Sequence, residues 1–134
     1  MAGTETRTEA LPGEDAVRLS VPAALEYVRI VRLTGSGVAS RLGFDVEEIE
    51  NLRVALDELA SMAIELASSG ELEVTFFTTD TELRIEGRAP VANGADVGVE
   101  ALTAQILKAV IDDYELRAAD GYVCFSCVTR RPLI

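Results

Sequence analysis

The chain has 134 residues, 49% hydrophobic and 26% charged, which suits one globular domain with a buried core. Twelve Lys and Arg against 23 Asp and Glu give a net charge of −11, which disfavours contact with nucleic-acid phosphates. The charge would attract a partner with a basic face, or serve only solubility. No apolar run reaches the roughly 20 residues of a membrane-spanning helix, and the start has no secretory-signal pattern. We therefore expect a cytoplasmic protein that binds neither nucleic acid nor membranes.

The first fifteen residues are small, polar and acidic, and include a proline and a glycine. They predict a flexible acidic tail over residues 1–15, followed by a single folded domain over residues 16–134. Residues 17–21 then alternate between apolar and polar side chains, which indicates a half-buried strand at the start of the domain.

A first helix is expected from residue 23 to about residue 33, after a proline that suits a first helical turn. The apolar residues that recur there at helical spacing include Leu25, Val28 and Leu33. Two glycines, Gly35 and Gly37, leave open whether the helix breaks or continues to Arg41.

A second, longer helix is predicted over residues 46–67. Asp45 and Glu48 have the spacing of a capping box, with Asp in place of the usual Ser or Thr. Gly70 provides a plausible end. The apolar stripe of this helix consists of Ile49, Leu52, Leu56, Leu59, Ala60 and Ala63.

Two hairpins flank a loop and a third helix in the rest of the chain, and Asp120-Gly121 is a strong turn signal for the second hairpin. This order of elements predicts an α+β fold: a two-layer sandwich whose mixed or antiparallel sheet is covered by helices on one face. The expected segments are strands 72–78 and 82–88, loop 89–98, helix 99–111, and strands 114–118 and 122–130.

The two cysteines, Cys124 and Cys127, have the CxxC spacing of many redox and zinc sites. They lie, however, in a β-branched and aromatic segment that is typical of a strand. Residues three apart in a strand point to opposite faces and lie roughly 10 Å apart, beyond the ~7 Å limit for a disulfide. The sequence has no histidine and no second CxxC to complete a zinc site. We therefore interpret both cysteines as packed thiols.

Residues 52–67, LRVALDELASMAIELA, resemble the long helix of the anti-sigma-factor serine kinases. These belong to the GHKL (histidine-kinase-like) ATPase superfamily, with its Bergerat-like fold, and the likeness is greatest to actinobacterial stress-response and sporulation anti-sigma factors. In that family a Glu is the general base and an Asn four residues later holds Mg²⁺. The resemblance places Glu58 at the first position and Met62 at the second. A thioether is a soft ligand, whereas Mg²⁺ requires hard oxygen donors.

Two glycine motifs that the resemblance implies are incomplete. The family's Asp-x-Gly-x-Gly motif, whose Asp binds the adenine amino group, would fall within residues 86–98. Only Asp96 and Gly98 match it in part there. The glycine-rich lid that offers backbone N–H groups to phosphates keeps only Gly94 and Gly98. Glu100 follows at the start of the next helix and would repel phosphate. We expect no cofactor, with weak binding of ATP and magnesium as the alternative.

The resemblance implies an anti-sigma factor that sequesters an RNA polymerase sigma factor and is displaced by an antagonist protein. Arg29 falls where a relative uses an arginine against sigma, and Arg32 lies three residues further on, so both are candidate partner-binding residues. Exposed apolar residues on the first strand and helix would also allow a homodimer. The missing metal ligand favours sequestration without phosphoryl transfer. The alternatives are an ATP- and magnesium-dependent serine kinase that phosphorylates its antagonist, and a protein-binding adaptor outside transcription.

The same residues have simpler interpretations, which remain open at this point. Arg29 and Arg32 would also solubilise an amphipathic helix without touching a partner. Asp57 and Glu58 would form a solvated acidic edge of the long helix. Met62 would either fill the space of a nucleotide or pack in the core.

Overall fold

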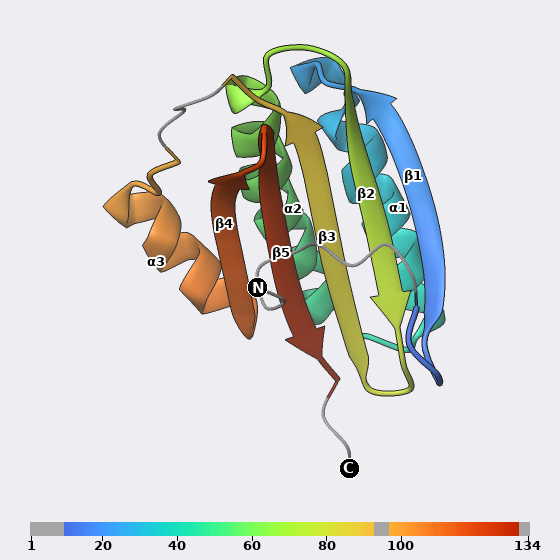
Figure 1. The fold of residues 1–134 in the computed structure, drawn as a ribbon. Helices are drawn as coiled ribbons and strands as arrows, with labels where there is room; N and C mark the ends of the chain where they lie inside the picture. The colour runs from blue at the N-terminus through green and yellow to red at the C-terminus, as the bar shows by residue number, and fades with distance from the viewer. Residues whose placement is uncertain (1–9, 93–96, 132–134) are drawn as a thin grey trace.

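The computed structural model describes residues 10–92 and 97–131. Within them, a five-stranded sheet has the order β1-β2-β3-β5-β4, and every neighbouring pair is antiparallel. Figure 1 shows α1 and α2 along one face of this sheet, with α3 on the β4 side. The predicted α+β two-layer fold is confirmed, and the sheet is antiparallel throughout. The elements are β1 (Asp15–Pro22), the short 3₁₀ helix η2 (Leu25–Tyr27), α1 (Val28–Arg41), α2 (Val46–Leu66), β2 (Glu71–Thr78), β3 (Glu82–Pro90), α3 (Ala101–Val110), β4 (Asp113–Ala119) and β5 (Tyr122–Arg130).

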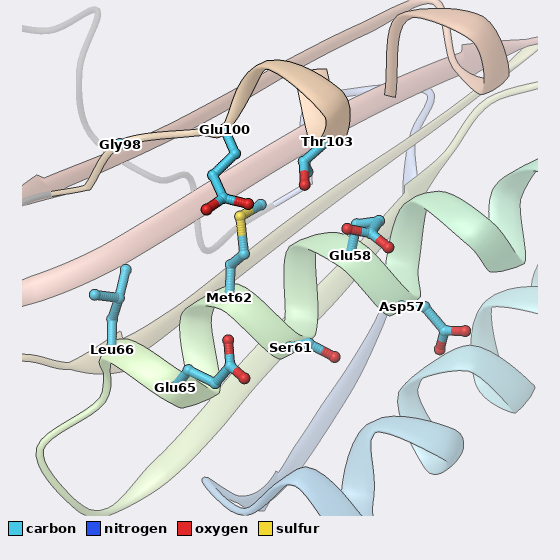
Figure 2. A pocket seen from close by; sticks show the side chains of 9 residues that line it. All are labelled: Asp57, Glu58, Ser61, Met62, Glu65, Leu66, Gly98, Glu100 and Thr103. Carbon is cyan, nitrogen blue, oxygen red and sulfur yellow. The ribbon is translucent and has the colours of Figure 1, made fainter. Parts of the chain in front are cut away.

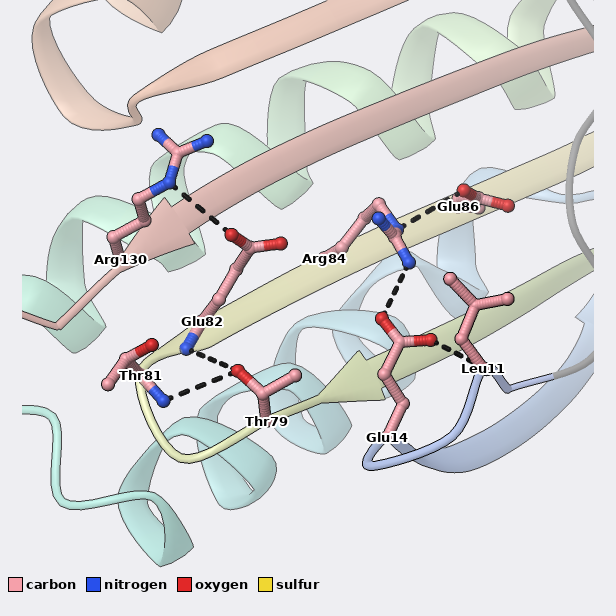
Figure 3. Close-up of polar contacts among 8 residues, drawn as sticks. All are labelled: Leu11, Glu14, Thr79, Thr81, Glu82, Arg84, Glu86 and Arg130. Atoms are coloured by element: carbon pink, nitrogen blue, oxygen red, sulfur yellow. Dashed lines mark hydrogen bonds and ion pairs between the residues drawn. The ribbon is translucent and has the colours of Figure 1, made fainter. Parts of the chain in front are cut away.

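The first strand begins two residues earlier than the sequence predicted, because β1 starts at Asp15. Just before it, Glu14 Oε2 accepts a hydrogen bond of 2.7 Å from Arg84 Nη2, and Glu14 Oε1 accepts one from the Leu11 backbone N–H (Figure 3). Arg84 also lies 3.4 Å from Glu86 Oε2 on the same strand. The end of the predicted 1–15 tail is thus attached to β3, whereas residues 1–9 lie outside the described part.

Helix α1 continues through both glycines to Arg41, which resolves the alternative left open by the sequence. The expected apolar face is wrong in part, since Leu25 and Leu33 are 52% and 60% exposed. The face of α1 that packs on α2 instead includes Gly35, where a Cβ would lie 2.4 Å from Leu56 Cδ1, so a larger residue would displace Leu56 or separate the helices. The buried residues of α1 are Val28, Val31, Gly35 and Ala39.

Two substitutions in α1 should change stability in opposite directions. We expect Gly35→Ala to lower the free energy of unfolding by about 1–3 kcal/mol, because the added methyl group overpacks the contact with Leu56. An added Cβ at Gly37 meets nothing within 4 Å, so Gly37→Ala should raise stability by about 0.5–1 kcal/mol through helix propensity. Urea unfolding of both variants measures the difference. Equal effects would show that Gly35 is not required for the contact between the helices.

Helix α2 begins with the predicted capping box. Asp45 Oδ1 accepts a hydrogen bond from the Glu48 N–H at 2.7 Å, and Glu48 Oε1 accepts one from the Asp45 N–H at 2.8 Å. The predicted apolar stripe also faces the core, with Ile49 partly buried and the other five residues fully buried. This stripe fixes the rotation of α2, and it therefore directs the Glu58 edge of the helix away from the sheet's core.

Both predicted hairpins are present. The second closes through Asp120 and Gly121, whose φ angles of 55° and 80° suit the turn that an Asp-Gly pair favours. β3 extends to Pro90 and so takes the first two residues of the predicted 89–98 loop, and α3 starts at Ala101 rather than residue 99. Among the residues described, no helix combines the length and the apolar character needed to cross a lipid bilayer.

The cysteines occupy opposite faces of β5, as the strand geometry predicted. Both thiols are free and buried. Cys127 belongs to the core cluster between sheet and helices, while Cys124 lies outside that cluster. Burial raises the pKa of the Cys127 thiol to about 12, so it stays protonated and unreactive near neutral pH. These positions support the interpretation of packed thiols.

Candidate functional site

A pocket of about 620 Å³ opens between α2 and the segment that leads into α3 (Figure 2). Six of the lining side chains come from α2, and the others come from the start of α3 and the residues just before it. Four of the nine residues carry a carboxylate, and none carries a positive charge. The lining residues are Asp57, Glu58, Ser61, Met62, Glu65, Leu66, Gly98, Glu100 and Thr103.

The structure brings Glu58 and Met62 together in this pocket, one helical turn apart on the same side of α2. Figure 2 shows the Met62 side chain extending from α2 toward Glu100, which reaches back from the opposite wall. Met62 is thus a lining residue as well as a partly buried neighbour of the core. Sequence reasoning missed Glu65, although it lies three residues after Met62 and so on the same face of the helix.

The donor set does not match a magnesium-bound nucleotide. Within residues 10–92 and 97–131, no three Asp, Glu, Cys or His side chains are grouped so that they could hold a metal ion. Met62 offers only a thioether at the position where the family's resemblance implies the Mg²⁺-binding Asn. Among the described residues, no Lys or Arg lines the pocket to meet phosphates. Two positions of the expected glycine motifs, Gly94 and Asp96, lie outside the described residues.

The two candidate arginines of α1 lie in different surroundings. Arg29 is exposed, as a partner-binding residue requires. Arg32 turns toward α2, where its Nη1 donates hydrogen bonds of 2.7 and 2.9 Å to the two carboxylate oxygens of Asp57. Arg32 therefore differs from Arg29 in that its guanidinium takes part in the α1–α2 contact, and its role in partner binding stays a prediction. Asp57, in turn, both lines the pocket and holds α1.

The Arg32–Asp57 pair should contribute more to stability than an ordinary surface pair. Its side chains are 27% and 40% exposed, and one nitrogen contacts both carboxylate oxygens. We expect Arg32→Gln to cost about 1 kcal/mol, and less at high salt. The matched control is Arg53→Gln, which removes a more exposed pair with Glu50 within α2 and should cost under about 0.5 kcal/mol. Equal losses in urea unfolding would contradict the special role of the pair between helices.

An antiparallel sheet with helices on one face, and a pocket beside Glu58 on the long helix, define the chain as a histidine-kinase-like α+β domain. No protein-family model matches the sequence. The serine-protein kinase RsbW of Listeria monocytogenes is 31% identical over 129 residues, an alignment that covers 80% of this chain and 82% of the relative. The chain therefore belongs to the family of the serine-protein kinase RsbW.

Other relatives match a shorter region. RsbW of Bacillus pumilus is 42% identical over 77 residues, and RsbW of Bacillus subtilis is 40% identical over 75 residues. Each alignment covers 53% of this chain and only 48% or 47% of the relative, so the chain spans about half of their length. The crystal structure of the RsbU and RsbW domains of a Mycobacterium tuberculosis protein superimposes with a TM-score of 0.69 over 88% of this chain and 33% of that one. Its sequence identity of 14% supports the fold alone.

Proposed function

We propose that this chain is an anti-sigma factor that sequesters an RNA polymerase sigma factor, is released by an antagonist protein, and acts without phosphoryl transfer. Family membership supports the class. The observation that carries the proposal is the outer face of α1, where Arg29 is exposed beside Ile30 and Leu33, which are 39% and 60% exposed. Large apolar side chains exposed next to an arginine are typical of a protein-binding surface.

The charge of α1 contrasts with that of the whole chain. Its sequence, VRIVRLTGSGVASR, contains three arginines and no acidic residue, although the chain carries a net charge of −11. This helix suits a partner surface that combines apolar and acidic side chains. Binding there would bury Ile30 and Leu33 and pair the planar guanidinium of Arg29 with a carboxylate.

Sequestration of this kind needs no chemical step. A bound domain masks the surface through which the sigma factor contacts polymerase or promoter, and an antagonist that competes for the same helix restores it. We include a homodimer in the proposal, because β1 is an edge strand of the sheet and exposes 42% of Val17 next to the helix layer.

A second candidate function is the serine-kinase activity after which the relatives are named. Glu58 favours it, since this carboxylate lines the pocket at the position of the family's general base. Activity would require the pocket to hold ATP and magnesium and the antagonist to supply the serine. The third candidate, an adaptor outside transcription, would use the same α1 surface with another partner.

Complex formation tests the proposal directly. The purified chain is mixed with each sigma factor of its source organism, without nucleotide, and the mixtures are analysed by size-exclusion chromatography with light scattering. We expect a stable complex with at least one sigma factor, and the mass of the free chain reports whether it is a dimer. An adaptor would bind none of the sigma factors, and this result would contradict the proposal.

A further inference from the structure

The carboxylates of the pocket come from both of its walls. Glu58 and Glu65 lie two turns apart on α2, and Glu100 lies on the opposite wall (Figure 2). The fourth carboxylate, Asp57, is compensated by Arg32. The other three carboxylates are not compensated by any Lys or Arg among the described lining residues. Within the described chain, no group of three or more acidic side chains could hold a metal ion that would neutralise them.

Glu100 lies at the N-terminus of α3, a position that would otherwise favour a bound phosphate. It is the N-cap residue of α3, and its side chain makes no capping hydrogen bond with the helix. The N-terminus of a ten-residue helix presents free N–H groups and a partial positive charge that attract anions. Here the chain's own carboxylate lies at that end and extends over the pocket toward Met62. An incoming phosphate would therefore meet a negative charge beside the N–H donors of the helix.

The α2 wall of the pocket is also negatively charged. Glu58 precedes Met62 by four residues and Glu65 follows it by three, so the two carboxylates flank the methionine on one face of the helix. An asparagine at position 62 would bring a hard oxygen ligand but leave both charges in place. Even magnesium-bound ATP keeps a net negative charge, so the repulsion would persist.

We propose that the carboxylates of Glu65 and Glu100, and not the loss of a magnesium ligand at position 62 alone, make this pocket reject anionic nucleotides. This inference rests on the proposed function and deepens it, since it explains why a member of a family named for kinase activity would act by contact alone. The pocket has a volume of about 620 Å³ and a carboxylate, Glu58, at the family's general-base position, but its charge is wrong for an anionic nucleotide.

Calorimetric titration with ATP and magnesium tells whether the carboxylates or the missing magnesium ligand prevent nucleotide binding. The wild type and Met62→Asn should show no measurable binding at millimolar nucleotide. Met62→Asn combined with Glu65→Gln and Glu100→Gln should bind measurably, with a dissociation constant at least about tenfold below the highest nucleotide concentration at which Met62→Asn alone shows no binding. The matched control combines Met62→Asn with Glu47→Gln and Asp80→Asn, two exposed acidic residues outside the pocket, and should not bind.

A second readout locates the binding. The chain contains two methionines, Met1 and Met62, so a sample with ¹³C-labelled methionine methyl groups gives two signals, and Met62→Leu assigns them. In Glu65→Gln/Glu100→Gln, ATP should shift the Met62 signal, whereas the wild-type signal should stay unchanged. Thermal unfolding confirms that each variant is folded.

Four results would overturn the proposal: micromolar binding by the wild type, recovery of binding by Met62→Asn alone, equal recovery in the control, or no recovery in the neutralised variant. None of these titrations contains a sigma factor. A failure of this inference is therefore distinguishable from a failure of the proposed sequestration, which complex formation tests separately.

Discussion

Replacing Gly87 by alanine should lower the free energy of unfolding by about 2–3 kcal/mol, the largest effect we expect from one added methyl group. Gly87 lies in the central strand β3 directly opposite Phe125 on β5. A Cβ at this position would lie 2.3 Å from Phe125 Cε2 and 2.4 Å from Cζ. The ring is 1% exposed and packed in the core, so it has no free space into which it could tilt.

A double-mutant cycle tests whether this ring is the cause. Phe125→Leu alone should destabilise the domain through lost burial, but it also removes the atoms that an alanine at position 87 would meet. Gly87→Ala should therefore cost at least about 1 kcal/mol less in the Phe125→Leu background than in the wild type. Additive losses of stability in urea unfolding would mean that the contact with Phe125 is not the reason why position 87 requires glycine.

Arg29→Glu should weaken binding of the proposed sigma-factor partner by about a hundredfold or more, because it replaces the exposed cation of the α1 surface with a negative charge that would repel the acidic surface proposed for that partner. Stability should change by no more than about 0.5 kcal/mol, since the side chain is exposed. Calorimetric titration of the folded variant with the sigma factor measures both the affinity and the stoichiometry.

Arg41→Glu is the control for this prediction. Arg41 is exposed at the other end of the same helix, and its replacement changes the net charge by the same amount. We expect it to weaken binding by less than about tenfold, through long-range electrostatics only. Equal losses would assign the effect to net charge, and an unchanged affinity of Arg29→Glu would remove Arg29 from the interface.

The elements whose signals lie within a few neighbouring residues could be predicted from the sequence. The capping box of Asp45 and Glu48 located the start of α2, and Asp120-Gly121 located the second turn, because both signals are local. The buried face of α1 could not be predicted in the same way. Its contact depends on the absence of a side chain at Gly35, and a search for large apolar residues selects Leu33 instead.

The candidate site was predictable only along single helices. Helical spacing correctly placed Glu58 and Met62 on one face, and the position of Glu100 at a helix start was also visible. The pairing of Arg32 with Asp57 joins residues 25 positions apart in different helices, so no local pattern could reveal it. The opposition of α2 and the start of α3, which makes the acidic residues line one pocket, likewise depends on how the helices pack.

The most direct test of the central claim is to incubate the chain with the proposed sigma factor and antagonist, ATP and magnesium, and to follow two quantities. Chromatography measures the sigma complex, and intact-mass spectrometry measures the antagonist. Sequestration by contact predicts that the antagonist displaces the sigma factor while its own mass stays unchanged. An antagonist whose mass increases by one phosphoryl group, only when the chain is present, would contradict the account and establish the chain as an active kinase.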